Sequence, residues 1–334
     1  MATENTSVVL ARRPTGAPVA EDFALQTTAL PSLNDGEILL KNHFVSLDAG
    51  FRNWMDEDSG DDVLPAMPIG APVMGLVLGE VMESRHPEFT PGTLLMARLA
   101  WQEYSITDAA DFLIRLPEPL EAEPAAYLGL LGDTGLSAYF GLRDIGKPKP
   151  GETVLISAAA GAVGSVAGQI ARIMGARAVG ITSGAEKSQK LITELGYDAV
   201  VDRNDDLISQ ITAACPNGVD VYFDNVGGPL LETVIDALNE GGRVVLCGAV
   251  STYGTEQPGP ANLFQLVTKQ ASMTGFLTHT RAEEYPEARA QLAAWLKEGK
   301  INAPEYRLEG IESVAQAFCD LFAGRNFGKT IVAL

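Results

Sequence analysis

The segment AAAGAVGS (158–165) places very small residues between an apolar stretch, TVLIS (153–157), and a segment with helical spacing. Residues 159–164 have the spacing of the dinucleotide-binding motif GxGxxG, with Ala159 in the first glycine position and Gly161 and Gly164 in the other two. A tight turn and a close approach of the backbone to a pyrophosphate require small residues there, and the N–H groups that open the next helix can face the phosphates. The motif therefore predicts dinucleotide binding; a glycine-rich helix that only packs closely is the alternative.

The residues at the end of the next predicted strand (177–182) indicate whether the dinucleotide is NAD or NADP. An NAD site normally places Asp or Glu at that tip, where it binds a ribose hydroxyl. This strand ends in Thr182 and Ser183, while Lys187 stands just inside the next helix and Arg203 follows the third strand. Hydroxyl groups and cations suit a 2′-phosphate, which a carboxylate would repel. The pattern favours NADP(H), with ordinary surface charges as the other interpretation of Lys187 and Arg203.

Strand-like and helix-like segments alternate through the middle of the chain. The predicted strands cover 153–157, 177–182, 199–202, 219–224, 243–248 and 273–277, and the predicted helices cover 162–174, 185–195, 207–214, 229–238 and 283–298. Strands separated by helices of about 10–15 residues imply βαβ units and hence a doubly wound parallel sheet of the α/β class. Strand-like segments broken by Pro and Gly make the first ~120 residues β-rich instead. Since 334 residues are many for a single core, two domains are expected.

Charge and composition exclude several classes of partner. The chain has 43 acidic and 24 basic residues and a formal net charge of −19, which repels nucleic acid and anionic membranes. Its three cysteines are scattered and form no disulfide framework. The first residues lack the layout of a signal peptide, and no apolar run approaches ~18 residues. We expect a soluble, cytoplasmic protein that acts on a small molecule.

Five segments together carry a resemblance to a known family. They are GLSAYFGL (135–142), AAAGAVGSVAGQIAR (158–172), YFDNVGG (222–228), LCGAVSTY (246–253) and NFGKTIV (326–332). This combination resembles the zinc-independent branch of the medium-chain dehydrogenases/reductases, namely the NADP-dependent alkenal, prostaglandin and curcumin double-bond reductases. The resemblance covers nearly the whole chain. It implies a β-rich GroES-like domain formed from both chain ends (1–125, with a return at 300–334) and a Rossmann NADP-binding domain (126–299).

The same resemblance implies a nucleotide site that runs along the ends of the parallel strands. The implied positions are Ala162, Val163 and Gly164 at the pyrophosphate, Lys187 at the 2′-phosphate, Asn225, Cys247, Gly248, Ala249 and Ser251 after the fourth and fifth strands, Phe276, Leu277 and Thr278 near the nicotinamide, and Asn326 from the tail. A zinc site is not expected. Where zinc relatives carry Gly-His-Glu, this chain has Gly70-Ala71-Pro72, and its three histidines are far apart in the sequence.

Two departures from the family pattern fall where a substrate would bind. Gly50, in DAGFR (48–52), stands at the position of a family tyrosine, and Asp133 stands at the methionine of a Met-Pro pair. Asp133 could orient a polar substrate or relay a proton, or it could cap the helix that begins near Gly135. Apolar side chains are expected to complete the pocket walls, and core packing would explain any one of them almost as well. They are Phe51, Trp54, Met74 and Phe264.

The resemblance also implies the reaction, which is reduction of the carbon–carbon double bond of an α,β-unsaturated ketone or aldehyde by hydride transfer from NADPH to the β-carbon. Tyr253 matches the family tyrosine that would stabilise the enolate oxygen and assist protonation, unless it only packs in its loop. An NADPH quinone reductase and a non-catalytic NADPH-binding regulator remain alternative functions. A homodimer is expected through MTGFL (273–277), because an apolar edge strand would otherwise be prone to aggregation.

Overall fold

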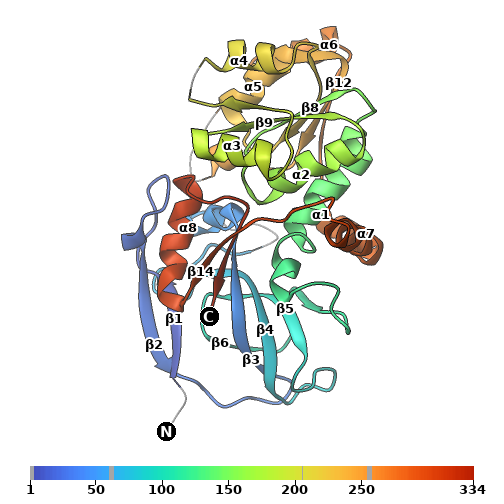
Figure 1. The fold of residues 1–334 in the computed structure, drawn as a ribbon. Helices are drawn as coiled ribbons and strands as arrows, with labels where there is room; N and C mark the ends of the chain where they lie inside the picture. The colour runs from blue at the N-terminus through green and yellow to red at the C-terminus, as the bar shows by residue number, and fades with distance from the viewer. Residues whose placement is uncertain (1–3, 60–63, 205, 254–257) are drawn as a thin grey trace. The chain divides into compact units, whose positions relative to one another are not determined.

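The alternating strands and helices in the middle of the chain fold as one sheet with helices on both faces (Figure 1). The structure is a computed structural model that describes residues 4–59, 64–204, 206–253 and 258–334. The chain divides into two units, and each is described here by itself. Unit 1 comprises residues 1–128, 306–325 and 330–334, and unit 2 comprises residues 129–305 and 326–329.

Unit 2 contains a six-stranded sheet in the order β10-β9-β8-β11-β12-β13, and its paired neighbours run parallel. The strands are β8 (Thr153–Ile156), β9 (Arg177–Thr182), β10 (Ala199–Asp202), β11 (Val219–Asp224), β12 (Leu238–Leu246) and β13 (Ser272–Gly275). Numbered along the chain this is the order 3-2-1-4-5-6, in which the direction of winding reverses between β8 and β11. The predicted α/β class with a doubly wound parallel sheet is confirmed, and ligands of such sheets bind at the carboxyl end of that reversal.

The helices of unit 2 accompany this sheet. They are α1 (Asp133–Phe140), α2 (Ala162–Ile173), α3 (Ala185–Thr193), α4 (Leu207–Ala214), α5 (Gly228–Ala237), α6 (Phe264–Thr268) and α7 (Tyr285–Lys297). Of these, α2, α3, α4 and α5 contact its strands directly, whereas α1 packs on α2 and α7 packs on α1. In α5 the buried residues Leu231, Val234 and Ile235 have the i, i+3, i+4 spacing of a helix face that packs on a core. Figure 1 shows α4 and α5 above the sheet and α2 and α3 below it. A π-helical turn, η4 (Gly141–Gly146), continues α1, and a 3-10 segment, η6 (Thr278–Glu284), precedes α7.

Three predicted strands end earlier than expected. The segment 153–157 was predicted as a strand, and β8 ends at Ile156. The segment 243–248 was predicted as a strand, but β12 ends at Leu246 because the N–H groups of Cys247 and Gly248 both turn to the carbonyl of Asp224, at 2.9 and 3.1 Å. The segment 273–277 was also predicted as a strand, but β13 ends at Gly275, and Phe276 and Leu277 link it to η6 without regular secondary structure. All three early endings lie at the carboxyl edge of the sheet.

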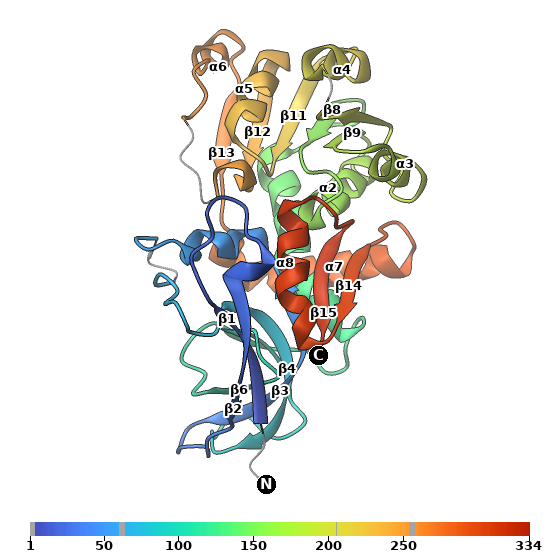
Figure 2. The same cartoon turned by 90° about the vertical axis from the view of Figure 1, so that its left-hand side faces the viewer.

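Unit 1 is mostly antiparallel β-structure. Its elements are β1 (Glu4–Leu10), β2 (Phe23–Ala29), β3 (Ile38–Leu47), β4 (Met74–Ser84), β5 (Leu94–Ala100), β6 (Tyr104–Thr107), β7 (Leu113–Arg115), β14 (Glu305–Glu309), α8 (Val314–Phe322) and β15 (Lys329–Ala333). The main sheet has the order β14-β15-β3-β4-β5-β7. Trp101 is fully buried in its core, with its ring centroid 5.1 Å from that of Phe318 and 6.1 Å from that of Phe23. Strands from both ends of the chain therefore build one core, together with α8 (Figure 2). Within the described ranges, no helix is both long and apolar enough to cross a bilayer.

Candidate functional site

The turn between β8 and α2 has the geometry of an anion-binding turn. Ala158 lies at φ +46°, a left-handed conformation that non-glycine residues seldom adopt. A Cβ atom on Gly164 would lie 2.4 Å from the carbonyl oxygen of Ala158, so this position requires glycine. The first helical hydrogen bond runs from Ser165 N–H to the carbonyl of Gly161 (2.9 Å), which leaves the N–H groups of residues 162–164 without an acceptor inside the helix. Such a helix start can bind a pyrophosphate.

The tail of the chain reaches the same turn. Gly328 N–H donates to the carbonyl of Ala160 at 2.8 Å, and Gly161 and Gly328 form an isolated parallel bridge. Asn326 is 8% exposed, and its side-chain amide donates to the carbonyl of Gly328 at 3.0 Å. The structure therefore brings Asn326 beside the predicted pyrophosphate turn, although more than 160 residues separate them in the sequence.

The tip of β9 gathers the three residues predicted for a 2′-phosphate. Ser183 follows the strand, and Arg203 is held there because its N–H donates to the carbonyl of Thr182 at 2.9 Å. Lys187, in α3, faces this tip, where burial and the charge of Arg203 lower the pKa of its amine from the ordinary value. Two cations that disfavour each other's charge would be stabilised by an anion placed between them. The arrangement suits a phosphate group.

The neighbouring strand contributes an acid that the sequence analysis missed. Asp202 ends β10, and its carboxylate accepts N–H groups from Gly184 (3.2 Å) and Asn204 (3.0 Å). One carboxylate oxygen, Oδ2, thus holds the turn that carries Ser183, and the other, Oδ1, holds the turn that follows β10. The signal in the sequence was the acid at the end of the third predicted strand, which only the pairing of β9 with β10 brings to this tip.

A buried carboxylate fixes the turn after β11. Asp224 is fully buried, and it accepts hydrogen bonds from the hydroxyls of Ser157 (3.1 Å) and Tyr222 (2.8 Å) and from the N–H groups of Val226 and Gly227, both at 3.0 Å. Asn225, which was predicted, donates its side-chain amide to the carbonyl of Ser157 at 2.8 Å. The supporting residues were missed, although an acid at the end of the apolar run VDVYFD was a visible signal. The network holds Asn225 at the point where the winding reverses.

The loop after β12 is joined to this turn by hydrogen bonds. Val250 N–H donates to the carbonyl of Asn225 at 3.2 Å, and the Ser251 hydroxyl donates to the carbonyl of Val226 at 2.6 Å. The predicted residues Cys247, Gly248, Ala249 and Ser251 therefore lie beside Asn225. Burial raises the pKa of the Cys247 thiol to about 12, so this cysteine is not a thiolate nucleophile at neutral pH.

Tyr253 directs its hydroxyl back to the same loop. The hydroxyl oxygen accepts Ala249 N–H at 3.3 Å, and a Cβ atom on Gly248 would lie 3.5 Å from it. Burial is the main cause that raises the pKa of Tyr253 above its ordinary value, and the backbone hydrogen bond from Ala249 opposes the shift. The phenol therefore stays protonated at neutral pH. Because its oxygen already accepts from the backbone, its proton can be donated to a ligand oxygen.

The segment after β13 lies against α1. The Thr278 hydroxyl donates to the carboxylate of Asp133, and a Cβ atom on Gly141 would lie 3.1 Å from the ring of Phe276. Gly132, not Asp133, is the N-cap residue of α1, and Asp133 lies in the first turn. The interpretation of Asp133 as a helix cap is therefore wrong, because its carboxylate is bonded to a residue 145 positions away.

Most residues predicted for the pocket walls lie in unit 1. Gly50, Phe51 and Trp54 belong to a 3-10 segment, η2 (Ala49–Met55), and Met74 begins β4. Phe51 is a core residue at 8% exposure, with its ring centroid 5.6 Å from that of Trp54. A Cβ atom on Gly50 would meet nothing within 4 Å, so this position has room for a side chain.

Phe264, which was predicted as a pocket wall, does not lie with the other predicted site residues of unit 2. It begins α6 and is 73% exposed. At the end of α6, Lys269 accepts Gly241 N–H at its carbonyl (2.7 Å), which ties the helix to the early part of β12 rather than to the carboxyl edge. The described part of the chain also holds no group of three or more His, Cys, Asp or Glu side chains that could bind a metal ion.

Comparisons with known proteins agree with this geometry. Residues 6–114 match a family described as the N-terminal domain of oxidoreductase, and residues 162–294 match a family described as zinc-binding dehydrogenase. The chain is 37% identical to the NADPH-dependent curcumin reductase of Escherichia coli, over 98% of this chain and 96% of that protein. It is 40% identical to prostaglandin reductase 1 of Rattus norvegicus, over 95% of both chains. The crystal structure of CurA from Vibrio vulnificus in complex with NADPH superposes with a TM-score of 0.91, at 38% identity and 98% coverage of both chains.

Proposed function

The chain belongs to the zinc-independent, NADP-dependent medium-chain dehydrogenases/reductases, and we propose that it uses NADPH to reduce the carbon–carbon double bond of α,β-unsaturated ketones and aldehydes. NADPH, when bound, supplies a hydride from carbon four of its nicotinamide to the β-carbon of the substrate. The glycine turn that opens α2 would hold the pyrophosphate. The cations Lys187 and Arg203 would bind the 2′-phosphate and so favour NADPH over NADH.

The observation that carries this proposal is the protonated Tyr253 hydroxyl at the carboxyl edge of β12. As hydride reaches the β-carbon, negative charge develops on the carbonyl oxygen, and a hydrogen-bond donor placed there stabilises the transition state. The phenol of Tyr253 is such a donor, and it can also assist protonation of the α-carbon, directly or through water. Removing one donor of this kind typically costs about 2.7–4 kcal/mol, or roughly 100- to 1,000-fold in kcat.

The test is NADPH oxidation with a linear enal, a benzylidene ketone, a naphthoquinone and a saturated ketone, followed by identification of the products. We expect saturated carbonyl products from the enal and the benzylidene ketone, and no turnover of the saturated ketone. Turnover of the quinone alone would identify a quinone reductase. NADPH binding without any turnover would identify a non-catalytic protein. Either result would overturn the proposal.

A matched pair of variants tests the role of Tyr253. Tyr253→Phe should lower kcat/KM for the benzylidene ketone by roughly 100-fold while the affinity for NADPH is unchanged. Tyr306→Phe is the control, because it removes a phenol that is bonded to Asp320 at 2.9 Å inside unit 1. If Tyr253→Phe keeps the kcat/KM of the wild type, Tyr253 has no role in the mechanism, although the proposed activity would still stand.

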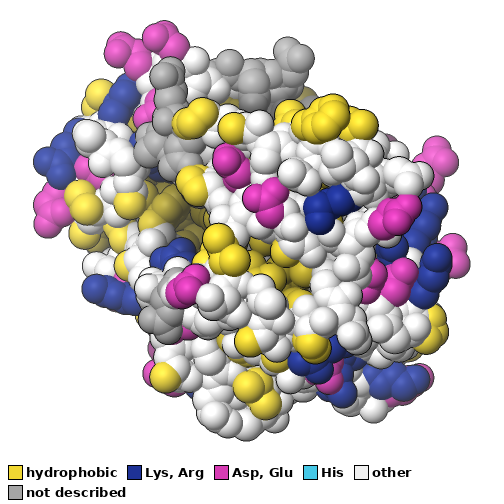
Figure 3. All heavy atoms as spheres, turned by 90° about the horizontal axis from the view of Figure 1, so that it is seen from above, with side chains coloured by type: hydrophobic (Ala, Val, Ile, Leu, Met, Phe, Trp, Pro, Cys, Tyr) yellow, Lys and Arg dark blue, Asp and Glu magenta, His cyan; other side chains and the backbone are white. Residues whose placement is uncertain are grey.

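We also propose that the enzyme is cytoplasmic and that two copies of it associate through β13. This strand is at one end of the order of the six-stranded sheet. The neighbouring helix α6 carries the exposed apolar residues Phe264 (73%) and Val267 (65%), and Leu263 (46%) directly precedes it. Figure 3 looks down on this end of unit 2 and shows hydrophobic side chains gathered at its surface. Burial of such side chains and of an open strand edge favours self-association. Light scattering should give a dimer for the wild type and a monomer for Phe264→Lys/Val267→Lys; a monomeric wild type would contradict the proposal.

A further inference from the structure

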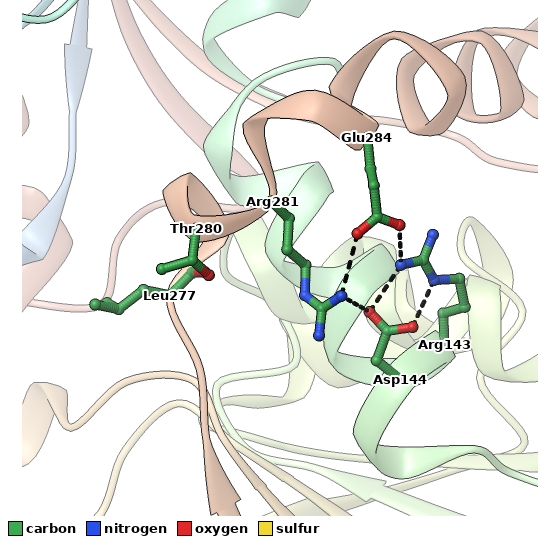
Figure 4. Close-up of polar contacts among 6 residues, drawn as sticks. All are labelled: Arg143, Asp144, Leu277, Thr280, Arg281 and Glu284. Carbon is green, nitrogen blue, oxygen red and sulfur yellow. Dashed lines mark hydrogen bonds and ion pairs between the residues drawn. The ribbon is translucent and has the colours of Figure 1, made fainter.

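Four charged side chains connect η6 to the π-helical turn η4 (Figure 4). From η4, Arg143 donates to the carboxylate of Asp144 at 2.6 and 2.9 Å and to that of Glu284 at 2.6 Å. From η6, Arg281 contacts Asp144 at 3.1 Å and Glu284 at 3.2 Å. Two guanidinium groups and two carboxylates thus alternate in a closed set of ion pairs, which binds one segment to the other more firmly than a single exposed pair would.

Arg281 sits at a break in the backbone of η6. Its φ and ψ of −117° and 25° are not helical, so the chain kinks at this residue between two short helical turns. One nitrogen atom, Nη1, makes both ion pairs, and the guanidinium carbon lies 5.8 Å from the centroid of the Phe140 ring. The side chain of Arg281 therefore holds the kink by fixing it to α1 and η4.

A second attachment holds the start of η6. The Thr278 hydroxyl donates to Asp133 in the first turn of α1, and the Thr280 hydroxyl donates to the carbonyl of Leu277 at 2.7 Å. Leu277, which directly precedes these attachments, is 59% exposed, and Figure 4 shows its side chain directed away from the four charges. A single exposed leucine is common on protein surfaces, but this one follows β13 at the carboxyl edge of a doubly wound parallel sheet, where the ligands of such sheets bind. The geometry indicates a contact surface for a ligand at the end of β13.

We propose that Arg281, together with Asp144 and Glu284, is a positioning residue that fixes the turn formed by residues 276–280, so that Leu277 forms one wall against the nicotinamide and the enone. This inference rests on the proposed function. It assigns no chemical step to Arg281. Loosening the turn would let the nicotinamide and the substrate sample unproductive geometries, while the phosphates of the cofactor stay bound at α2 and α3. The expected consequence is a lower kcat with little change in the affinity for NADPH.

Arg281→Met and Arg281→Lys test this proposal as a pair. Methionine keeps most of the aliphatic stem and removes both ion pairs. Lysine supplies one charged nitrogen, which can replace the single Nη1 atom that makes both contacts. Arg243→Met is the matched control, because Arg243 pairs with Glu152 and donates to the carbonyl of Gly146 at 2.9 Å, at the amino end of the sheet. It removes an ion pair from unit 2 without touching the turn.

The first readout needs no substrate, since the emission of bound NADPH depends on the surroundings of its nicotinamide. Arg281→Met should change the emission intensity of the binary complex at an unchanged Kd, and Arg281→Lys and Arg243→Met should leave both as in the wild type. With the benzylidene ketone, Arg281→Met should lower kcat about tenfold and raise the isotope effect for NADPH deuterated at carbon four. Thermal unfolding of all three variants separates these effects from lost stability.

The two proposals fail in distinguishable ways. If the wild type reduces no enone, the proposed function fails, and the emission experiment still decides whether Arg281 controls the surroundings of the nicotinamide. If the wild type reduces the enone and Arg281→Met matches it in emission and kcat, the positioning role is wrong. A variant that becomes monomeric with unchanged emission would assign the turn to the contact between copies, which would also overturn the proposal.

Discussion

Replacement of Lys187 by alanine should weaken NADPH binding and leave NADH binding unchanged. Lys187 lies in α3 beside the tip of β9, where burial and the charge of Arg203 both lower the pKa of its amine. That lowered pKa means that the folded protein holds the ammonium group in an unfavourable place. A dianionic phosphate between Lys187 and Arg203 would relieve this cost, whereas the ribose hydroxyl of NADH would not.

The magnitude follows from the kind of bond that is lost. A hydrogen bond to a charged group contributes about 1.5–3 kcal/mol, which corresponds to roughly a 10- to 150-fold change in Kd. Arg203 remains in Lys187→Ala and keeps one cation at the phosphate, so we expect the lower half of this range, about 30-fold. The affinity of the wild type for NADPH should also fall as the pH rises toward the lowered pKa of Lys187, because the ammonium charge is lost there earlier than for an ordinary lysine.

Fluorescence titration of both nucleotides measures this effect directly. Lys190→Ala is the matched control, because Lys190 lies three residues along α3, pairs with Glu186 at 2.8 Å and has its amine over the ring of Phe327. The control should bind NADPH as the wild type does. An equal loss of affinity for NADPH and NADH in Lys187→Ala, or no loss for either, would refute the assignment of a 2′-phosphate to this tip.

Three further predictions concern packing, substrate choice and pH. Gly168→Ala should destabilise the protein by about 1–3 kcal/mol, because its Cβ atom would lie 2.0 Å from the ring of Tyr197. Thermal unfolding measures this change. In the control Gly259→Ala the Cβ atom meets nothing within 4 Å, so the Tm should be unchanged. Gly50→Tyr should fold with the wild-type Tm, since that position is open, and should lower kcat/KM for bulky enones relative to small ones in steady-state assays. Burial raises the pKa of Tyr253 above the ordinary value of 10.0, so its hydroxyl should stay protonated up to that pH. A decrease of kcat/KM with a pKa below 10.0 that is present in the wild type and absent in Tyr253→Phe would contradict this prediction.

The sequence by itself was sufficient for the class of fold and for the nucleotide turn, because both depend on local patterns. The alternation of apolar strands with helices requires a parallel sheet, and three of the six predicted strands of that sheet, 177–182, 199–202 and 219–224, have the same bounds as β9, β10 and β11. The small residues at 159–164 are required by backbone geometry within one turn, as the 2.4 Å approach of a Cβ on Gly164 to Ala158 demonstrates. The absence of an acid after β9 was likewise a local observation, and it correctly favoured NADP.

Tertiary structure alone decided how distant side chains meet. The carboxylate of Asp133 looked like a helix cap, since Asp is common there, but Gly132 takes that position and Thr278 competes successfully for the carboxylate. Asp202 reaches the tip of β9 only through the pairing of two strands, and Asp224 accepts hydrogen bonds from Ser157, which follows β8, as well as from its own turn. Phe264 is apolar and near the site in the sequence, yet α6 is tied to the early part of β12. Hydrogen bonds between residues far apart in the chain leave no periodic pattern in a single sequence, so these positions became visible only in the folded chain.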